Sequence, residues 1–480
     1  MRNGVWVALG SYWAIGFGFV ANIALIRLLT PAIYGEFALA MFFATLFDLY
    51  GKVSLNFAFA QQRKVNGETL GTLFVVSVLL GASTLLLSLL AAPVLQLTGY
   101  SPHIVFTTIA LCTLIFVSSW VSVFGIELET SLHSKPISIA MVVATPLSYI
   151  PAFWLAYHGL GQYSLLSQTA TYSLFTGIVT MLYTICKRRH VLSLSWRFNR
   201  RLATQYLRFG ITSGAGNFLT SLLMNADNFL LGTIAGATAL GYYDRAYRLA
   251  QWPGLLLNSI YGRAAVFTYA QLREAPQKLQ RSFEMLLWVS SHVTAPIALA
   301  LFLSAQDLVH LLFGPQWEPS VMPLRILLIA ALLRPLWENA WAIFVGLGLP
   351  KQVIRLSVLQ LVILLIAGTA LSMAFSAIGT AVAVVLMFAS GLVVAKRLLQ
   401  NHLLTQHWNQ VFFGPVVAIA LTAASYPLLV RLIGNALPLW LAVAWKVIWA
   451  VVGFSFFALI IQPRQFTGRM VYVWRLLRAR

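Results

Sequence analysis

Charged residues are scarce in this chain of 480 residues. Aspartate and glutamate together supply only 12 positions, and charged residues of both signs make up 9% of the chain. Hydrophobic residues fill 60% of the positions, whereas typical soluble proteins are about 45–50% apolar. The composition therefore excludes a protein whose mass is mainly soluble, and it indicates a polytopic membrane protein.

Cysteine is rare, and a nucleotide-binding loop is missing from the sequence. The two cysteines, Cys112 and Cys186, lie in separate apolar runs, which predicts neither a disulfide framework nor a metal site. No glycine-rich loop of the Walker type is present, so we do not expect the chain alone to drive transport with ATP. We predict no cofactor.

Apolar runs long enough to cross a bilayer recur from end to end. About 20 apolar residues in a helix cross a hydrocarbon core about 30 Å thick, and lipid leaves no water to satisfy an open backbone. The first run, residues 4–26, is too long for the core of a cleavable signal peptide. The predicted fold class is therefore an all-α polytopic membrane protein with about fourteen spans. They lie at residues 4–26, 34–60, 70–96, 103–124, 137–158, 162–186, 205–234, 239–265, 283–305, 321–349, 354–375, 376–395, 411–432 and 436–462.

Positive charge gathers in short connections between the spans. The net charge is +20, and 23 of the 32 lysines and arginines lie at the N-terminus, in every second connection or in the C-terminal tail. This alternation is the positive-inside pattern, which predicts that both termini are cytoplasmic. It also argues against a nucleic-acid partner. The alternation requires an even number of spans, and twelve would satisfy it as well as fourteen.

The longest cytoplasmic connection divides the chain into lobes. We predict an N-terminal six-helix lobe at residues 1–186 and a basic cytoplasmic linker at 187–204. A C-terminal six-helix lobe follows at 205–395, with an appended helix pair and basic tail at 396–480. The charges of the linker favour contact with anionic membrane lipids at the inner leaflet.

Short matches in the two lobes indicate an internal repeat. The stretch RLLTPAIYGEFALA (residues 27–40) is similar to GTIAGATALGYYDRA (residues 232–246), and YGK and FAQQ in the first lobe match YGR and YAQL in the second, in the same order. Six spans per copy would make the copies parallel repeats, related by an axis along the membrane normal. Two such bundles enclose a cleft, and rocking of repeats about such a cleft is how many transporters expose a substrate alternately to either side.

Nine basic residues lie outside the cytoplasmic connections. A charge at the centre of a membrane-spanning helix costs at least about 2.5–3.5 kcal/mol, so such residues usually face a bundle interior or an aqueous cavity. Arg431 and Lys446 fall in the appended pair and are set aside. The other seven are the predicted substrate-binding residues: Arg27, Lys52, Arg245, Arg248, Arg263, Arg325 and Arg334.

The depth of these residues in the membrane separates two alternatives, a role in a substrate cavity and anchoring at the membrane interface. From the helical rise, Arg248 lies about 13 Å inside the eighth predicted span, and Arg334 lies about 14 Å deeper than Arg325. We favour a cavity role for Arg248 and Arg334. For the basic residues nearer the span ends, anchoring at the membrane interface is the stronger alternative. Below Arg248, Pro253 is expected to kink the helix.

Three acidic residues accompany these arginines. Asp244 and Arg248 are four residues apart, as are Arg334 and Glu338, so each pair shares a helix face, and Asp227 lies near the predicted depth of Arg245. These acids either neutralise the arginines or carry a coupling proton or sodium ion. Because arginines outnumber acids, the cavity should select an anion, and guanidinium binds phosphate with two parallel hydrogen bonds.

Three stretches of the chain resemble the polysaccharide exporter family, in particular oligosaccharide flippases of the Wzx type in the branch of colanic-acid exporters. They are NADNFLLGTIAGATALGYYDRAYRLAQWP (residues 225–253), FLSAQDLVHLLFGPQWEPSVMPLRILLIAALLRPL (residues 302–336) and the stretch at 27–40. The family belongs to the superfamily that also holds MATE multidrug antiporters and the lipid II flippase MurJ.

The resemblance implies a function and a site. It implies a two-lobed MATE/MurJ-like transporter in the bacterial inner membrane that flips oligosaccharide repeat units linked to undecaprenyl diphosphate. The lipid-linked oligosaccharide would be the main partner, with a polymerase and other polysaccharide assembly proteins as further partners. By motif position, the cavity contacts of the family fall on Arg245, Arg248 and Arg263 in one lobe and on Arg27 and Lys52 in the other.

Two other functions, an antiporter and an enzyme, are alternatives to the flippase. An ion-coupled multidrug or cation antiporter of the same fold would be favoured if Asp227 or Asp244 lined the cavity without an arginine partner. A polysaccharide polymerase or ligase typically needs a sizeable outer loop with catalytic groups, and the outer connections here are short. We therefore predict that the chain is not an enzyme.

Overall fold

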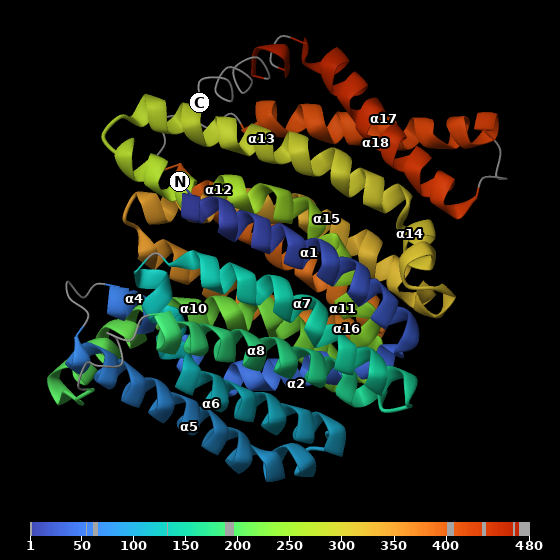
Figure 1. Ribbon diagram of the computed structural model, residues 1–480. Helices are drawn as coiled ribbons and strands as arrows, with labels where there is room; N and C mark the ends of the chain where they lie inside the picture. Colours follow the sequence, from blue (N-terminus) through green and yellow to red (C-terminus); the bar gives the residue numbers. More distant parts are fainter. Residues whose placement is uncertain are drawn as a thin grey trace. The chain divides into compact units, whose positions relative to one another are not determined.

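A computed structural model describes residues 2–53, 55–60, 66–131, 133–187, 196–400, 408–433, 438–463 and 466–469 (Figure 1). Over these residues the regular structure is helical throughout, with no strand. The fourteen predicted spans lie mainly on helices where the structure describes them, with non-helical residues inside some of them, among them Asp48, Val53 and Gln251. Ten helices of the described chain are long and apolar enough to cross a membrane. The prediction of an all-helical, multi-pass membrane protein is thus confirmed, whereas the count of fourteen spans stays a prediction.

Contacts between residues divide the chain into two compact units, Met1–Gly232 and Thr233–Arg480. The division falls beyond the predicted linker, because the segment that ends the linker packs on the first unit. Arg197 donates its backbone N–H to the carbonyl oxygen of Gly67 at 3.1 Å, and Asn199 donates to Thr72 Oγ1 at 2.9 Å. The arrangement as two lobes of six helices stays a prediction.

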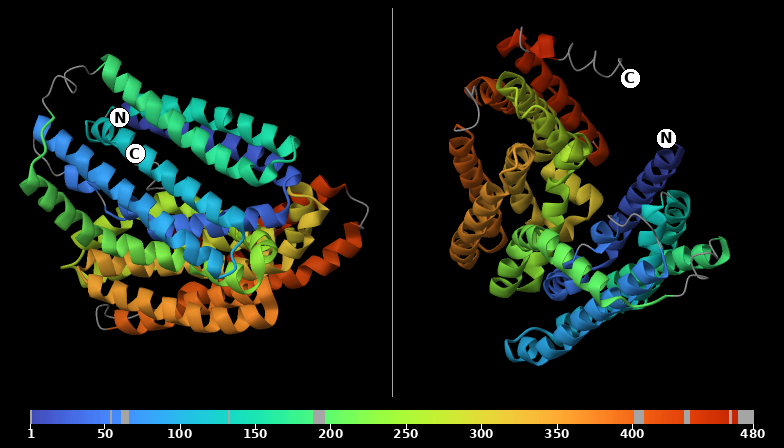
Figure 2. Two further views of the ribbon diagram at one scale, coloured as in Figure 1. Left: turned by 90° about the horizontal axis from the view of Figure 1, so that it is seen from below. Right: turned by 90° about the vertical axis from the view of Figure 1, so that its left-hand side faces the viewer.

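The N-terminal unit is built from long helices with short links. Its helices are α1 (Arg2–Leu28), α2 (Pro31–Phe47), α3 (Leu49–Lys52), α4 (Leu55–Ala60), α5 (Gly67–Leu97), α6 (Pro102–Thr130), α7 (Ser134–Tyr157), the 3₁₀ turn η1 (Gly161–Tyr163), α8 (Ser164–Lys187) and most of α10 (Arg200–Ile234). α5 packs against α6, and α7 packs against both α1 and α8 (Figures 1 and 2). Small residues allow such close packing in membranes. At Gly81 of α5, an added Cβ would come within 2.5 Å of the Ser119 hydroxyl of α6.

The C-terminal unit surrounds one central helix. Its helices are α11 (Gly236–Ala250), α12 (Trp252–Gln271), α13 (Pro276–Leu303), α14 (Ala305–Leu312), the 3₁₀ turn η2 (Pro315–Ser320), α15 (Val321–Gly346), α16 (Pro350–Leu399), α17 (Trp408–Ile433) and α18 (Leu439–Ile461). α15 packs against α11, α12, α13 and α16, while α17 and α18 pack against each other and against α13. This position explains why side chains of α15 recur in both cavities described below.

Helix α16 contains 50 residues, far more than one crossing requires. A straight helix of that length would extend about 75 Å, compared with a hydrocarbon core of about 30 Å. Ser376 interrupts it with a positive φ of 52° and a ψ of −131°. The interruption lies at the predicted junction between spans 354–375 and 376–395, which supports two crossings rather than one.

Both units break a helix at a corresponding place. In the first unit, α2 ends at Phe47, and Asp48 caps the short α3 by accepting a hydrogen bond from Gly51 N at 2.7 Å. In the second unit, α11 ends at Ala250, and α12 begins at Trp252. The predicted kink at Pro253 is therefore confirmed, since proline lacks the N–H that would continue the helix. The shared break supports the predicted repeat.

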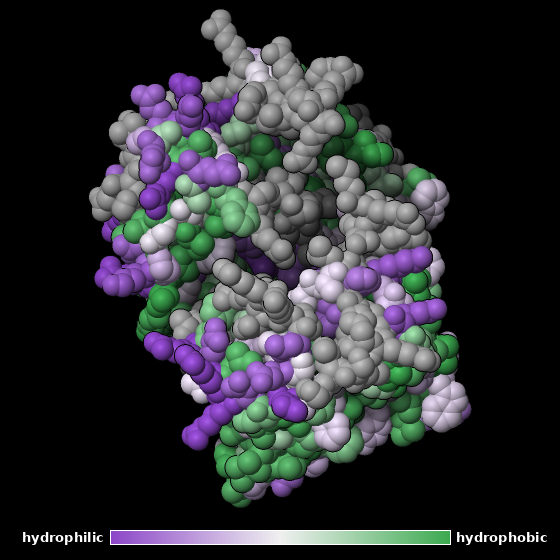
Figure 3. Space-filling view, turned by 60° about the vertical axis from the view of Figure 1, so that its left-hand side comes forward, coloured by the Kyte–Doolittle hydropathy of each residue, from purple (hydrophilic) through white to green (hydrophobic). Residues whose placement is uncertain are grey.

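The surface has separate polar and apolar regions. Figure 3 shows the molecule turned so that the left-hand side of Figure 1 comes forward. On this face, hydrophilic residues gather in some parts, and hydrophobic residues form broad patches elsewhere. Arg197, Arg200 and Arg201 of the predicted basic linker are exposed. Exposed apolar side chains on most of the long helices suit contact with lipid.

Candidate functional site

A charged triad of two buried residues, Asp244 and Arg245, and one exposed residue, Arg248, lies on α11. The carboxylate of Asp244 accepts hydrogen bonds from Nε of Arg245 at 3.0 Å and from Nε of Arg248 at 3.1 Å, and Arg245 Nη2 also contacts it. Two guanidinium groups therefore share one carboxylate, which leaves the triad with one net positive charge. The predicted pairing of Asp244 with Arg248 is confirmed.

The two arginines of this triad have different surroundings. The Arg245 side chain is 6% exposed, whereas that of Arg248 is 61% exposed. A buried charge is tolerated when it is paired and hydrogen-bonded, and Asp244 supplies this to Arg245. The geometry therefore favours a structural role for Arg245 and leaves Arg248 as the guanidinium that a ligand can reach. A substrate contact by either arginine stays a prediction.

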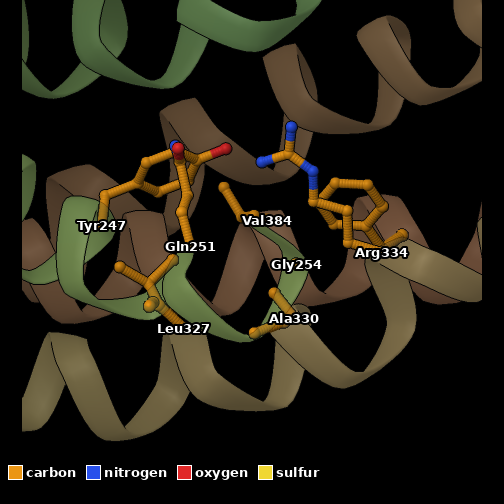
Figure 4. A pocket seen from close by; sticks show the side chains of 10 residues that line it. Tyr247, Gln251, Gly254, Leu327, Ala330, Arg334 and Val384 are labelled. Carbon is orange, nitrogen blue, oxygen red and sulfur yellow. The ribbon is translucent and has the colours of Figure 1, made fainter. Parts of the chain in front are cut away.

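A small pocket adjoins the break between α11 and α12 (Figure 4). Its volume is about 20 Å³, which is enough for one group of the size of a water molecule. The amide of Gln251 and the guanidinium of Arg334 lie on one side of it, and Leu327 and Ala330 lie on the other (Figure 4). The complete lining comprises Tyr247, Ala250, Gln251, Gly254, Leu327, Ala330, Ala331, Arg334, Val384 and Phe388.

Arg334 reaches this pocket from the central helix α15. Its Nε donates to Glu338 Oε1 at 3.0 Å, so the predicted pair is confirmed. The two side chains are 27% and 28% exposed, so the pair is not sealed in a dry interior. The pair with Glu338 fixes the orientation of the Arg334 guanidinium at the edge of the pocket.

Arg325, near the start of α15, has different contacts. Its guanidinium lies 5.8 Å from the ring centroid of Phe302, and its Nε is buried without a hydrogen-bond partner. Among the residues that the structure describes, no acid forms an ion pair with Arg325. A cation over an aromatic face is stabilised by the quadrupole of the ring, which suits interfacial anchoring as well as ligand contact.

The remaining predicted residues are less fully defined. Arg27 is exposed in the last turn of α1. Asp227 is buried on α10, where its Oδ1 accepts from the N–H of Asn228 at 2.9 Å. The side chains of Lys52 and Arg263 lie outside the described residues, although their backbones belong to α3 and α12. Their predicted roles stay predictions.

Sequence reasoning missed several polar groups. Tyr247 and Gln251 line the pocket but carry no charge, so a search for charged residues in apolar runs passes over them. Lys446 of α18 was recognised in the sequence but set aside with the appended pair, and its partner was missed. It forms an ion pair with Asp307 of α14, and its ammonium also lies 5.9 Å from the ring of Tyr426. The sequence signal was present, because Lys446 is an isolated charge in an apolar run. Asp48, the cap at the helix break of the first unit, carries the same signal.

The fold places the chain in a known structural class. It is similar to a solved structure of the lipid II flippase MurJ in an inward closed conformation, with a TM-score of 0.76 at 11% sequence identity, over 96% of this chain and 100% of that one. It is also similar to an inward-facing MATE family multidrug resistance transporter, with a TM-score of 0.57 at 18% identity, over 83% of this chain and 93% of that one. The chain is thus a helical membrane protein with the fold shared by MurJ and MATE proteins.

Sequence comparison narrows this class to a family. The profile of the polysaccharide biosynthesis protein family matches residues 24–322, and the chain belongs to this family. This confirms the resemblance found in the sequence.

Two curated relatives illustrate the family. The lipopolysaccharide biosynthesis protein WzxC of Escherichia coli (strain K12) is 25% identical over 334 residues, which cover 68% of this chain and 66% of the relative. The succinoglycan biosynthesis transport protein ExoT of Rhizobium meliloti (strain 1021) is 24% identical over 320 residues, which cover 66% of this chain and 63% of the relative. The prediction of a transport protein rather than an enzyme agrees with these comparisons.

Proposed function

We propose that this protein flips oligosaccharide repeat units linked to undecaprenyl diphosphate across the bacterial inner membrane, for the synthesis of a surface polysaccharide. Three findings support the proposal: membership in the polysaccharide biosynthesis family, relatives named for lipopolysaccharide and succinoglycan synthesis, and the fold shared with a lipid II flippase. Both termini would lie in the cytoplasm, as the charge alternation predicts.

The triad on α11 is the observation that carries the proposal. Arg245 and Arg248 share the single carboxylate of Asp244, and Arg248 is largely exposed. Because Asp244 and the buried Arg245 neutralise one another, the surplus positive charge lies on Arg248. A charge within a membrane-spanning region is costly, and an anionic ligand would offset that cost. Guanidinium retains its charge when desolvated and matches a phosphate oxygen pair. A diphosphate-linked substrate meets this requirement.

Arg334 and Gln251 would provide the second contact. The pocket at the helix break admits one small group, and a phosphate oxygen or a sugar hydroxyl fits the hydrogen-bond donors that Arg334 and Gln251 present. In the proposed mechanism the two repeats rock about the bound head group, as in other transporters built from repeats. The helix break at Gln251 would then serve as the point where the helix bends.

The antiporter alternative required that Asp227 or Asp244 line the cavity without an arginine partner, and the structure defines the arginine partners of Asp244. Asp244 accepts hydrogen bonds from two arginines, so its carboxylate is already committed and does not offer an organic cation a free counter-charge. This geometry favours an anionic substrate.

Replacement of Arg248 and of Arg334 tests the proposed function. In a strain whose only copy of the gene is the variant, Arg248→Ala and Arg334→Ala should lower surface polysaccharide at least about tenfold, because a hydrogen bond to a charged group is worth about 1.5–3 kcal/mol. Lipid-linked repeat units should accumulate on the cytoplasmic side. Arg273→Ala, at an exposed arginine between α12 and α13, is the matched control and should export normally.

Insertion must be measured alongside export. Each variant should appear in the membrane fraction at the wild-type level, so that loss of polymer reports on transport rather than on folding. Wild-type polymer levels in both Arg248→Ala and Arg334→Ala would contradict the proposal.

A further inference from the structure

A second cavity lies in the C-terminal unit, away from the charged triad. Its volume is about 390 Å³, within the range of about 300–1,000 Å³ that is usual for ligand sites. It is bounded by α13, α15, α16 and α17. The lining consists of Ser291, Thr294, Ala295, Ile329, Leu332, Leu333, Leu336, Ala389, Leu392, Val393, Lys396, Phe412, Pro415, Val416 and Ile419.

The cavity is a groove between helices that do not close on one another. α13 packs against α15 and α17, and α15 packs against α16, but along the described residues α16 and α17 are not closely packed. Each wall is one helix face, because its residues are spaced three or four apart, as in Ala389, Leu392, Val393 and Lys396 of α16. The groove is therefore a regular feature of the helix arrangement and runs along the helix axes.

The wall of the groove offers hydrocarbon rather than hydrogen bonds. Its two hydroxyl groups already donate to their own helix: Ser291 Oγ to the carbonyl of Trp288 at 3.0 Å, and Thr294 Oγ1 to the carbonyl of Ser290 at 2.7 Å. Lys396 is the single charged residue of the lining. A sugar would leave its hydroxyl groups unpaired there, at a cost in free energy, whereas an acyl chain would not.

The position of the groove limits its occupant further. Ile329, Val393 and Val416 on its rim are exposed, so the described chain does not cover it. Each wall spans about 10 Å along its helix, only about a third of the hydrocarbon thickness, which is too short to seat a membrane-spanning helix. Lys396 lies in the last turn of α16, at the end that the charge pattern predicts to be cytoplasmic.

We propose that this groove is a binding site for an anionic phospholipid of the inner leaflet. One acyl chain lies between α16 and α17, and the phosphate lies beside the ammonium of Lys396, since basic pockets between helices on the cytoplasmic side attract anionic head groups. The lipid fills the gap that these helices leave and so joins the appended pair to the rest of the unit. This site is separate from the proposed transport function and would exist whether or not the chain moves an oligosaccharide.

Native mass spectrometry of the full-length protein with lipids of defined composition tests the proposal. In an equimolar mixture of phosphatidylglycerol and phosphatidylcholine, the wild type should retain one phosphatidylglycerol. Ala389→Phe, which fills the groove, should abolish this retention, whereas Ala424→Phe at an exposed position of α17 should not. Lys396→Gln should lower the preference for phosphatidylglycerol about fivefold, because one basic group near an anionic surface contributes about that much. Its neighbour Arg397→Gln, exposed and outside the lining, is the matched control.

A phosphatidylglycerol with a photoreactive group on its acyl chain locates the bound lipid. Crosslinks should fall on residues 389–396 of α16 and 412–419 of α17. If Lys396→Gln and the wild type showed the same preference for phosphatidylglycerol over phosphatidylcholine, the proposal would be overturned. This result would count even if Ala389→Phe failed to fold. Crosslinks confined to other surfaces, retention of a polyprenyl carrier instead of phospholipid, or a second copy of the chain on this face would overturn it as well.

Discussion

At the scale of the residue, one carboxylate sets the charge of the candidate site. Asp244 holds two arginines, one buried and one exposed. The buried partner requires it, because a guanidinium without a counter-charge in a low-dielectric interior is strongly destabilised. The exposed partner is aligned by the carboxylate and remains within reach of a ligand, because its side chain is 61% exposed. Position on the helix and exposure together give Arg245 and Arg248 different roles despite their proximity in sequence.

Removal of this carboxylate should therefore weaken the fold. We expect Asp244→Asn to lower the free energy of unfolding by about 3–5 kcal/mol, because Arg245 stays buried without a compensating charge. The measurement is the temperature at which half of the purified protein aggregates in detergent. Glu338→Gln is the control and should cost less, since its pair with Arg334 is partly exposed. A double variant with Asp244→Leu and Arg245→Met should recover stability, and a fully stable Asp244→Asn would refute this account of the triad.

At the scale of the element, an ion pair ties the appended helices to the unit. Lys446 on α18 contacts Asp307 on α14, and both side chains are mostly buried. The residues are 139 positions apart, so the contact depends on the packing of α18 and α17 against α13. Such a pair is expected to stabilise the packing of α18 on α14, because each partner would otherwise be a mostly buried charge without a counter-charge.

A double-mutant cycle measures the coupling free energy between Lys446 and Asp307. Lys446→Met and Asp307→Asn should each lower thermal stability, and the double variant should lose less than the sum, with a coupling of about 0.5–3 kcal/mol. Lys351→Met, at an exposed lysine in the first turn of α16, should leave stability near the wild-type value. Additive losses would show that the two residues do not act together.

The elements were largely predictable from the sequence, and their contacts were not. Runs of apolar residues predicted segments that are mainly helical where the structure describes them, since a bilayer permits little other structure. Pro253 predicted the break after α11, because the effect of proline is local. The burial of Arg245 and the partner of Lys446 depend on residues distant in sequence, so spacing along one helix could give their depth but not their neighbours. Tyr247 and Gln251 were not predicted, because they carry no charge and the sequence does not show which face of their helix lines a pocket.

At the scale of the whole molecule, the charge pattern predicts the orientation in the membrane. The connection between α12 and α13 should be cytoplasmic, and the turn η2 between α14 and α15 should face the opposite side. In a variant in which Cys112 and Cys186 are replaced by alanine, a cysteine introduced at Gln316 should react with a membrane-impermeant maleimide on intact cells. A cysteine introduced at Arg273 should react only after the membrane is opened. The reverse labelling pattern would invert the predicted topology.

The proposed function requires that positive charge beside the broken helix of the C-terminal unit bind a diphosphate. Its most direct test is the affinity of the purified protein in nanodiscs for an undecaprenyl-diphosphate oligosaccharide, with the same oligosaccharide on a neutral polyprenol for comparison. The wild type should prefer the diphosphate, and Arg248→Ala and Arg334→Ala should each weaken that binding about tenfold or more while leaving the neutral compound unaffected. Equal affinity of wild type and both variants for the diphosphate would contradict the claim.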